Sequence, residues 1–465
     1  MTASPDLLDR LNALDRAFDA ANRQADEPDA AVRLLERAAE NVLGNRVGAE
    51  DHEALERACT DRRAGPVALA LAARAALAAG ARETAVALLR RAQARAANHL
   101  TLQRMLAEAE ERPERDDAFA DRFCAAPFEN IETQPGGDVH FCCPAWLPVP
   151  IGNLGAQSAG EIWNSPAAQT IRASIHDGSY RFCSRTHCPK LSGDTLPRNE
   201  ELTKASQRRV AQARATAMED GPRKIVLSHD RSCNLSCPSC RKDLILARRP
   251  EQAAMNKMAD EVLFPLMRGA DRLRVTASGD PFGSAHFQYV LRHLDRAHAP
   301  HLKLDLQTNG VLLTPALWER LKLEGKVGML LVSADAARAE TYAVLRRGGR
   351  WDDLRRNLDF FAELRGAGRI DLFRLDFVVQ SANFREMPDF VQLARAVGCD
   401  GVKFQMIRSW GTYSPEEFAT VDISNPAHPD HDAFLGVLRD PVLRPPFAEF
   451  WGMQRALADA RCNAA

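Results

Sequence analysis

The chain has 465 residues, too many for a single ordinary hydrophobic core, and its formal net charge is −1. Hydrophobic residues make up 45% and charged residues 26%, proportions typical of a soluble globular protein with no general attraction for nucleic acid or for an anionic membrane. Because no apolar run approaches a membrane span and the first residues lack the apolar stretch of a secretory signal, we expect a cytoplasmic protein that binds neither nucleic acid nor membranes.

Residues 1–115 are predicted to form an all-α domain. Apolar residues recur at helical spacing, and Gly80 separates two of the helices. The apolar positions are Leu69, Leu77, Val86, Leu89, Leu102 and Leu106. This segment resembles a tetratricopeptide-type helical hairpin. Two roles stay open: a helical cap on the next domain, or a surface that binds a protein partner.

Residues 116–200 are predicted to form a small cysteine-rich α+β domain. The charged segment Glu111 to Arg122 is typical of a linker. The next 70 or so residues carry five of the eleven cysteines, several Pro and Gly, and short strand-like runs such as DVHFCC. In a chain without a secretory signal, clustered cysteines bind metal more often than they form disulfides. Because the segment has too many loops for a large core, a bound metal cluster would explain how it holds together.

Residues 201–410 are predicted to form an α/β domain. Six apolar, strand-like runs alternate with helical stretches, which implies parallel strands in βα units. The runs are KIVLSHD, RLRVTASGD, LKLDLQTNG, VGMLLVSAD, IDLFRLDFVVQ and VKFQMIRSW. Six right-handed units of this kind can curl into a partial (β/α)6 TIM-type barrel, whose chemistry lies at the carboxyl ends of the strands. Residues 411–465 are expected to be a helical or irregular extension.

Three cysteines follow the first predicted strand with the spacing C-x3-C-x2-C: Cys233, Cys237 and Cys240. Three thiolates on one short loop can hold one face of a [4Fe–4S] cluster and leave the fourth iron without a protein ligand. S-adenosylmethionine (AdoMet) can chelate that iron, and an electron from the cluster can then break its sulfonium C–S bond. The alternative is a zinc site, which normally requires four ligands.

The triplet resembles the signature of the radical SAM superfamily, and later segments agree with that family in order and in their position at strand ends. SGDP resembles the family's GGEP motif and would hold the AdoMet amino group, and other polar residues would contact its ribose or carboxylate. The AdoMet-binding residues implied by the resemblance are Ser278, Gly279, Asp280, Asn309, Ser333, Asp335, Arg346 and Asn383. The alternatives are a simple turn at SGDP, a helix N-cap at Asp335 and a solvated helix residue at Arg346. Ser239 departs from the family, which usually has an aromatic residue there beside the adenine.

The earlier cysteines resemble those of a SPASM-type domain, the auxiliary-cluster module of many radical SAM enzymes. By this resemblance, one auxiliary [4Fe–4S] cluster would be bound by Cys124, Cys142, Cys183 and Cys188. Cys143 would be a buried thiol or an alternate ligand. The module departs from the family because it precedes the barrel and has cysteines for only one cluster. Zinc stays open as the alternative for these four residues.

The resemblance implies an enzyme that generates a 5'-deoxyadenosyl radical and abstracts hydrogen from a substrate. We expect a peptide or protein side chain, with flavodoxin or ferredoxin as electron donor. The alternatives are a small-molecule substrate (a sugar, antibiotic or lipid precursor) and a non-catalytic iron–sulfur binding protein. Polar residues that face the barrel interior, among them Asp305, Arg374, Asp376 and Lys403, could bind substrate or satisfy one another.

Overall fold

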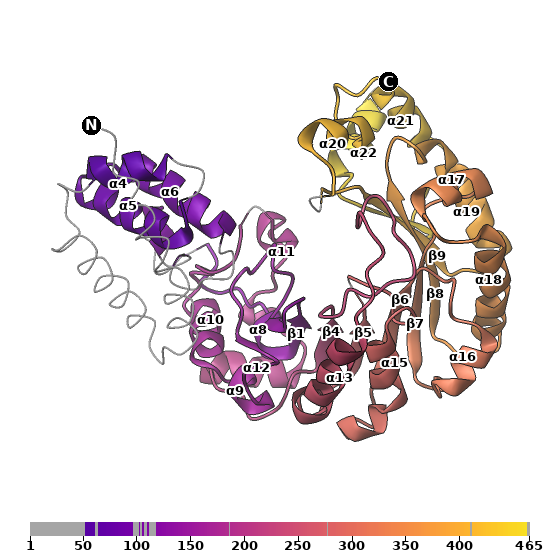
Figure 1. Ribbon diagram of the computed structural model, residues 1–465, viewed down its shortest axis with the longest axis horizontal. Helices are drawn as coiled ribbons and strands as arrows, with labels where there is room; N and C mark the ends of the chain where they lie inside the picture. Colours follow the sequence, from indigo (N-terminus) through magenta and orange to yellow (C-terminus); the bar gives the residue numbers. More distant parts are fainter. Residues whose placement is uncertain are drawn as a thin grey trace. The chain divides into compact units, whose positions relative to one another are not determined.

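The computed structural model describes residues 52–60, 64–95, 102, 105–106, 109–110, 118–185, 187–276, 278–409 and 412–462. The chain divides into two compact units, Met1–Pro222 and Arg223–Ala465 (Figure 1). Most of the predicted linker, and residues 1–51 of the predicted helical domain, lie outside the described residues. In the described part of the chain, no helix combines the length and the apolar character that crossing a membrane requires.

The first helices in the described part of the first unit are α4 (His52–Cys59), α5 (Pro66–Ala78) and α6 (Arg82–Arg95). Helix α5 consists almost entirely of Ala, Leu and Val, and it is the centre of a small apolar core. The helices end and begin on either side of Gly80, whose φ of +78° is a left-handed conformation that glycine adopts without strain. The predicted break at Gly80 is therefore present, whereas the tetratricopeptide likeness stays a prediction.

The rest of the first unit is a small antiparallel sheet with short helices. Strand β1 (Asn130–Thr133) pairs with β2 (Asp138–His140), which pairs with β3 (Gly152–Asn153). The helices are α8 (Ala126–Glu129), α9 (Ala159–Trp163), α10 (Pro166–His176), α11 (Pro189–Ser192) and α12 (Ala205–Ala213), with a 3-10 turn at Asn199–Glu201. Ser158 and Ser165 cap α9 and α10 with their hydroxyl groups.

Arg172 on α10 holds this loop-rich region together. Its guanidinium is buried and donates to the carbonyl oxygens of Pro127, Trp163 and Thr216 at 2.8–2.9 Å. It also lies 4.5 Å from the centre of the Trp163 ring. One side chain thus joins segments that are far apart in the sequence.

We expect Arg172→Met to destabilise the first unit by about 3 kcal/mol, because several buried carbonyl oxygens lose their donor. Hydrogen–deuterium exchange of α10 measures this change. Arg198→Met is the matched control, since Arg198 and Asp121 form an exposed pair, worth about 1 kcal/mol or less. Equal protection of α10 in the two variants would contradict this role of Arg172.

The second unit contains a parallel sheet. Its strands are β4 (Lys224–Leu227), β5 (Arg272–Val275), β6 (Lys303–Thr308), β7 (Val327–Ser333), β8 (Leu372–Val379), β9 (Gly401–Met406) and β10 (Ala448–Trp451). Each strand pairs in parallel with its neighbour in sequence order from β4 to β10. The six predicted strands are all present. The expectation of a helical or irregular tail is wrong at β10, which adds a seventh strand beside β9.

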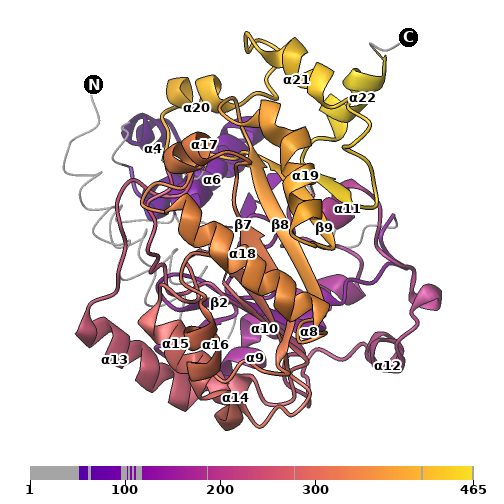
Figure 2. The ribbon, with the colours of Figure 1, turned by 90° about the vertical axis from the view of Figure 1, so that its right-hand side faces the viewer.

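Helices connect the strands: α13 (Arg249–Met258), α14 (Phe264–Leu266), α15 (Ala285–Arg292), α16 (Pro315–Arg320), α17 (Ala339–Leu345), α18 (Trp351–Gly366) and α19 (Met387–Ala396). Residues Ala259–Leu263 form a π-helical turn between α13 and α14, and 3-10 turns lie at Leu294–Ala297 and Phe384–Glu386. The tail adds α20 (Pro415–Val421), α21 (His431–Val437) and α22 (Gln454–Cys462). Figure 2 shows α18 lying along one face of the sheet, over β7 and β8. On β8, buried and half-buried residues alternate, so one face is apolar and the other carries Arg374 and Asp376.

The polar face of the sheet largely satisfies its own charges. Asp305 lies 2.5 Å from Arg272, and Arg374 lies 2.7 Å from Asp376. Burial is the main cause that lowers the pKa of Lys403 on β9, and Arg274 on β5 contributes to the same shift. Both side chains lie on half-buried positions of their strands, on the polar face of the sheet.

Candidate active site

The loop after β4 brings the three predicted cluster cysteines together. The side chains of Cys233 and Cys237 are buried and pack with Leu235, and Cys240 is exposed. Burial raises the pKa of Cys237, and the neighbouring Cys240 raises it further. Burial also raises the pKa of Cys233, and the neighbouring Cys237 contributes to that increase. The three thiols therefore interact at the carboxyl end of β4, which is where the sequence predicts the cluster.

The SGDP turn after β5 packs directly against this loop. A Cβ atom on Gly279 would lie 2.7 Å from the carbonyl oxygen of Ser232 and 2.8 Å from that of Asp230. The backbone N–H of Asp280 donates to the Ser232 carbonyl at 3.0 Å. The Ser278 hydroxyl donates to the Ser228 carbonyl at 2.6 Å. Glycine is thus required at position 279 because two main chains touch there.

The buried carboxylate of Asp280 is occupied by protein donors. One oxygen accepts the N–H groups of Phe282 and Gly283, at 2.9 and 3.1 Å. The other accepts the Thr308 hydroxyl and the Asn309 N–H, both at 2.8 Å. Burial raises the pKa of Asp280, and these four donors oppose the shift. The side chain fixes the ends of β5 and β6, so an AdoMet contact by this turn falls to Ser278 or to main-chain atoms.

Asn309 contacts the cysteine loop itself. Its side-chain N–H group lies 3.8 Å from the sulfur of Cys233 and donates to the Asn234 side chain at 2.9 Å. The next residue, Gly310, has a φ of +77°, and an added Cβ would lie 2.8 Å from both Leu354 and Val332. These contacts explain the sequence TNG at the end of β6.

Asp335 and Arg346 form a buried ion pair behind Cys237. Arg346 lies 2.7 Å from the Asp335 carboxylate, and its guanidinium donates to the Cys237 sulfur at 3.9 Å. Burial lowers and the Asp335 charge raises the pKa of Arg346, with a net upward shift. Neither alternative for these residues holds: Arg346 is not solvated, and the N-cap of α17 is Arg338.

Asn383 and Ser333 lie near this pair but differ in their bonding. The Asn383 side chain donates to the carbonyl oxygens of Asp335 and Val378, both at 2.9 Å, and accepts the Gln380 N–H at 2.9 Å. It is buried, and it orders the backbone around Asp335. Ser333 ends β7 on the half-buried polar face, in register with Asp376 on β8. The Ser333 side chain thus lies on the half-buried polar face of the sheet, whereas the Asn383 side chain is buried.

The four auxiliary cysteines also interact with one another, in the first unit. Burial raises the pKa of Cys142 well above its usual range, and the remaining contributions come chiefly from the other three predicted ligands, Cys183, Cys124 and Cys188. Gly137, which lies between Cys124 and Cys142 and has a φ of +90°, is part of the turn before β2. Cys142 thus interacts with each of the other three predicted ligands.

Two further observations concern the bonding of the cysteines and possible sites for a single metal ion. No disulfide joins the cysteines whose side chains are described. Within the same residues, no three His, Cys, Asp or Glu side chains gather closely enough to ligate a single metal ion. The buried thiol of Cys399 lies just before β9, at the amino end of that strand, and the Cys462 side chain lies outside the described residues.

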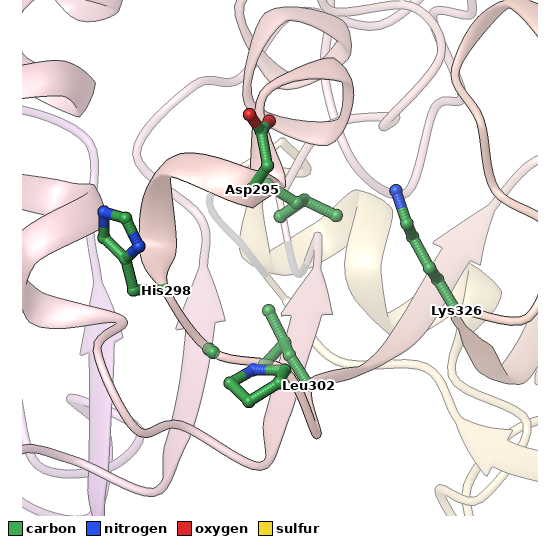
Figure 3. Close-up of a pocket in the computed structure, with 7 residues that line it drawn as sticks. Asp295, His298, Leu302 and Lys326 are labelled. Atoms are coloured by element: carbon green, nitrogen blue, oxygen red, sulfur yellow. The ribbon is translucent and has the colours of Figure 1, made fainter.

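A cavity of about 500 Å³ lies at the opposite end of the sheet from the cysteine loop (Figure 3). His298 and Leu302 on its wall precede β6, and Lys326 precedes β7. None of the predicted site residues lines it. The amino ends of the strands therefore carry none of the chemistry inferred from the sequence.

Arg241 contacts the cysteine loop, although the sequence analysis does not single it out. It directly follows the third cysteine, and its guanidinium donates to the Cys240 sulfur at 3.4 Å. The only signal in the sequence is this position, because nothing in the spacing of the motif requires an arginine there.

A buried histidine pair lies beside the site. The ring nitrogens of His229 and His286 are 2.8 Å apart, and the second nitrogen of His286 contacts the Asn256 side chain at 2.9 Å. Burial lowers the pKa of His286 to about 4, against a small opposing effect of Asp230. Burial and the His286 charge lower the pKa of His229 well below its usual range. Both rings are therefore neutral near pH 7.

We expect the second unit to lose stability as the pH falls from about 6.5 toward 4, because the unfolded chain binds protons that the folded pair excludes. The slope is at most about 1.4 kcal/mol per pH unit for each histidine. Urea unfolding at several pH values measures it. His286→Gln should flatten the profile in this window, and an unchanged profile would contradict the account.

We expect Asp280→Asn to destabilise the site by about 2–3 kcal/mol, because the amide cannot accept from all four donors. Hydrogen exchange of residues 229–247 and 308–313 reports the change. Asp371→Asn is the control in the same unit, since Asp371 is exposed and lies 3.7 Å from Lys303. If hydrogen exchange in these two segments is equally slow in both variants, Asp280 does not fix the loops after β4 and β6.

Residues 124–189 match the family model SPASM, described as an iron–sulfur cluster-binding domain. The chain is 29% identical over 182 residues to the AdoMet-dependent heme synthase of Methanosarcina barkeri (strain Fusaro / DSM 804), a match that covers 39% of this chain and 50% of that protein. The chain thus spans about half the length of this curated relative.

Two similar solved structures contain AdoMet. Streptococcus suis SuiB bound to S-adenosylmethionine is 14% identical, with 54% of this chain and 56% of that chain covered and a TM-score of 0.34. The structure of anSMEcpe with bound AdoMet is 18% identical, with 42% and 56% covered and a TM-score of 0.30. The SPASM match thus gives the chain an iron–sulfur cluster-binding domain that precedes the parallel strands in the sequence, and over 182 residues the chain is similar to an AdoMet-dependent enzyme.

Proposed function

We propose that the protein is a radical AdoMet enzyme whose first [4Fe–4S] cluster is held by Cys233, Cys237 and Cys240. With AdoMet at its open iron, such a cluster supplies a 5'-deoxyadenosyl radical that abstracts hydrogen from a substrate. We also infer that the parallel sheet curves into the partial barrel of the radical SAM superfamily, and that residues 1–115, 116–200, 201–410 and 411–465 are the four segments of the chain.

The observation that carries the proposal is the set of three thiols at the carboxyl end of β4. Each one lies within reach of a side-chain N–H donor, which suits thiolate ligands of a cluster better than neutral core cysteines. The set is one ligand short of the four that a closed cubane or a structural zinc site uses. An open iron is what an AdoMet site needs.

The chain's own residues would position the reactants. Asp280 and Asn309 fix the ends of β5 and β6 against the cysteine loop, and the Asp335–Arg346 pair supports Cys237. Ser278 and Ser333 lie at strand ends on the open side, where contacts to the AdoMet amino group and ribose are proposed. Substrate would then approach the polar face of the sheet.

We propose that Cys124, Cys142, Cys183 and Cys188 hold one auxiliary [4Fe–4S] cluster, closed by four protein ligands. Their mutual effect on the pKa of Cys142 supports this set. Such a cluster would pass electrons or shape the substrate site, with flavodoxin or ferredoxin as the external donor.

For the substrate, we propose a peptide or protein side chain. The resemblance to SPASM-bearing enzymes that modify polypeptides supports this choice, and the helical N-terminal region offers a surface for polypeptide capture. The second candidate is a small molecule, which the name of the Methanosarcina relative, a heme synthase, favours. Incubation with candidate peptides and with porphyrin precursors, followed by mass spectrometry, separates the two.

We expect anaerobically reconstituted protein to contain about eight irons and to release 5'-deoxyadenosine from AdoMet when reduced. A Cys233/Cys237/Cys240→Ala variant should lose about four irons and all nucleoside release, whereas Cys399→Ala, which changes a buried cysteine elsewhere, should keep both. A Cys124/Cys142/Cys183/Cys188→Ala variant should lose the other four irons, about half of the total. Zinc in place of iron, or nucleoside release by the first variant, would refute the proposal.

A further inference from the structure

Each of the three cysteines after β4 has its own side-chain donor, and the three donors come from different places in the chain. Asn309, at the end of β6, faces Cys233 at 3.8 Å. Arg346, after α17, faces Cys237 at 3.9 Å. Arg241, within the loop, faces Cys240 at 3.4 Å, the shortest of the three distances.

The two arginines differ in charge balance. Arg346 is neutralised by Asp335 at 2.7 Å. The other two hydrogen bonds of Arg241 go to neutral carbonyl oxygens, those of Arg231 at 2.7 Å and Ser278 at 2.9 Å. Among the described residues, no carboxylate forms an ion pair with Arg241. Among its hydrogen-bond partners, the Cys240 sulfur is therefore the one that can carry a negative charge.

Arg241 is also held firmly in place. Its side chain is 4% exposed, so solvent screens it little. Burial lowers its pKa, but Cys240, Cys233 and Cys237 raise it above its ordinary value. The same guanidinium joins the residue before the loop, the third cysteine and the SGDP turn after β5. A fixed charge that solvent screens little changes the electrostatic potential at any cluster that the three cysteine sulfurs bind.

We propose that Arg241 is a positioning residue that raises the reduction potential of the cluster held by the three-cysteine loop. This inference rests on the proposed function, since it requires a cluster on these cysteines. A reduced cluster carries one more negative charge than the oxidised one, and a buried guanidinium stabilises that charge. Hydrogen bonds to cluster sulfurs shift the potential in the same direction.

The test uses the full-length, reconstituted protein and three substitutions of Arg241. Arg241→Met removes the charge and the donor, Arg241→Gln keeps a donor, and Arg241→Lys keeps the charge. Arg347→Gln is the matched control: Arg347 binds Ser236 and the Lys242 carbonyl from the exposed side of the same loop and contacts no cysteine. The readout is a potentiometric titration followed by EPR, with the signal identified by its absence from the Cys233/Cys237/Cys240→Ala variant.

We expect the equilibrium constant for one-electron reduction to fall about tenfold in Arg241→Met and Arg241→Gln, which corresponds to about 59 mV. Arg241→Lys should stay within threefold of the wild type, and Arg347→Gln should match it. An unchanged potential in Arg241→Gln with normal iron content would overturn the inference. If Arg241→Met assembles no cluster, the difference in reduction potential between Arg241→Gln and Arg241→Lys still tests the inference. If the wild type assembles no cluster on this loop, the proposed function fails instead.

Discussion

The second unit depends on one buried carboxylate. Asp280 accepts four hydrogen bonds, two from its own turn and two from the end of β6, while its N–H group binds the loop after β4. Three strand ends are thereby fixed relative to one another by one residue. These four hydrogen bonds offset the free-energy cost of burying a charged carboxylate.

Polar bonding of this kind continues along the carboxyl edge of the sheet. Asn309 extends it to Cys233, and the Asp335–Arg346 pair extends it to Cys237. Asn383 in turn holds the backbone of Asp335, whose φ of +61° needs such support. Several residues that the family resemblance assigns to AdoMet therefore use their side chains to bind other parts of the protein and hold the site in shape. The proposed ligand contacts are those of Ser278 and Ser333, at the carboxyl ends of β5 and β7.

The sequence was most informative where periodicity and spacing carry physical meaning. Six strands were predicted because each is an apolar run that ends in polar or glycine residues, and Gly279 and Gly310 mark positions where the backbone leaves no room for a side chain. Strand β10 was missed because AEFW is short and because more than forty residues, which include α20 and α21, separate it from its partner β9. The roles of Asp280 and Asn383 could not be read from the sequence, because the same residues would suit either a ligand or the backbone. Arg241 was missed because its effect depends on which carbonyl groups and carboxylates surround it in space.

The proposed function requires a cluster on the loop after β4 with an iron open to AdoMet, distinct from the proposed cluster of the SPASM-type domain. The most direct test is the EPR spectrum of the reduced Cys124/Cys142/Cys183/Cys188→Ala variant, recorded with and without AdoMet. We expect one remaining [4Fe–4S] signal whose shape changes when AdoMet is added. A signal that AdoMet leaves unchanged, or no cluster signal at all in a folded variant, would contradict it.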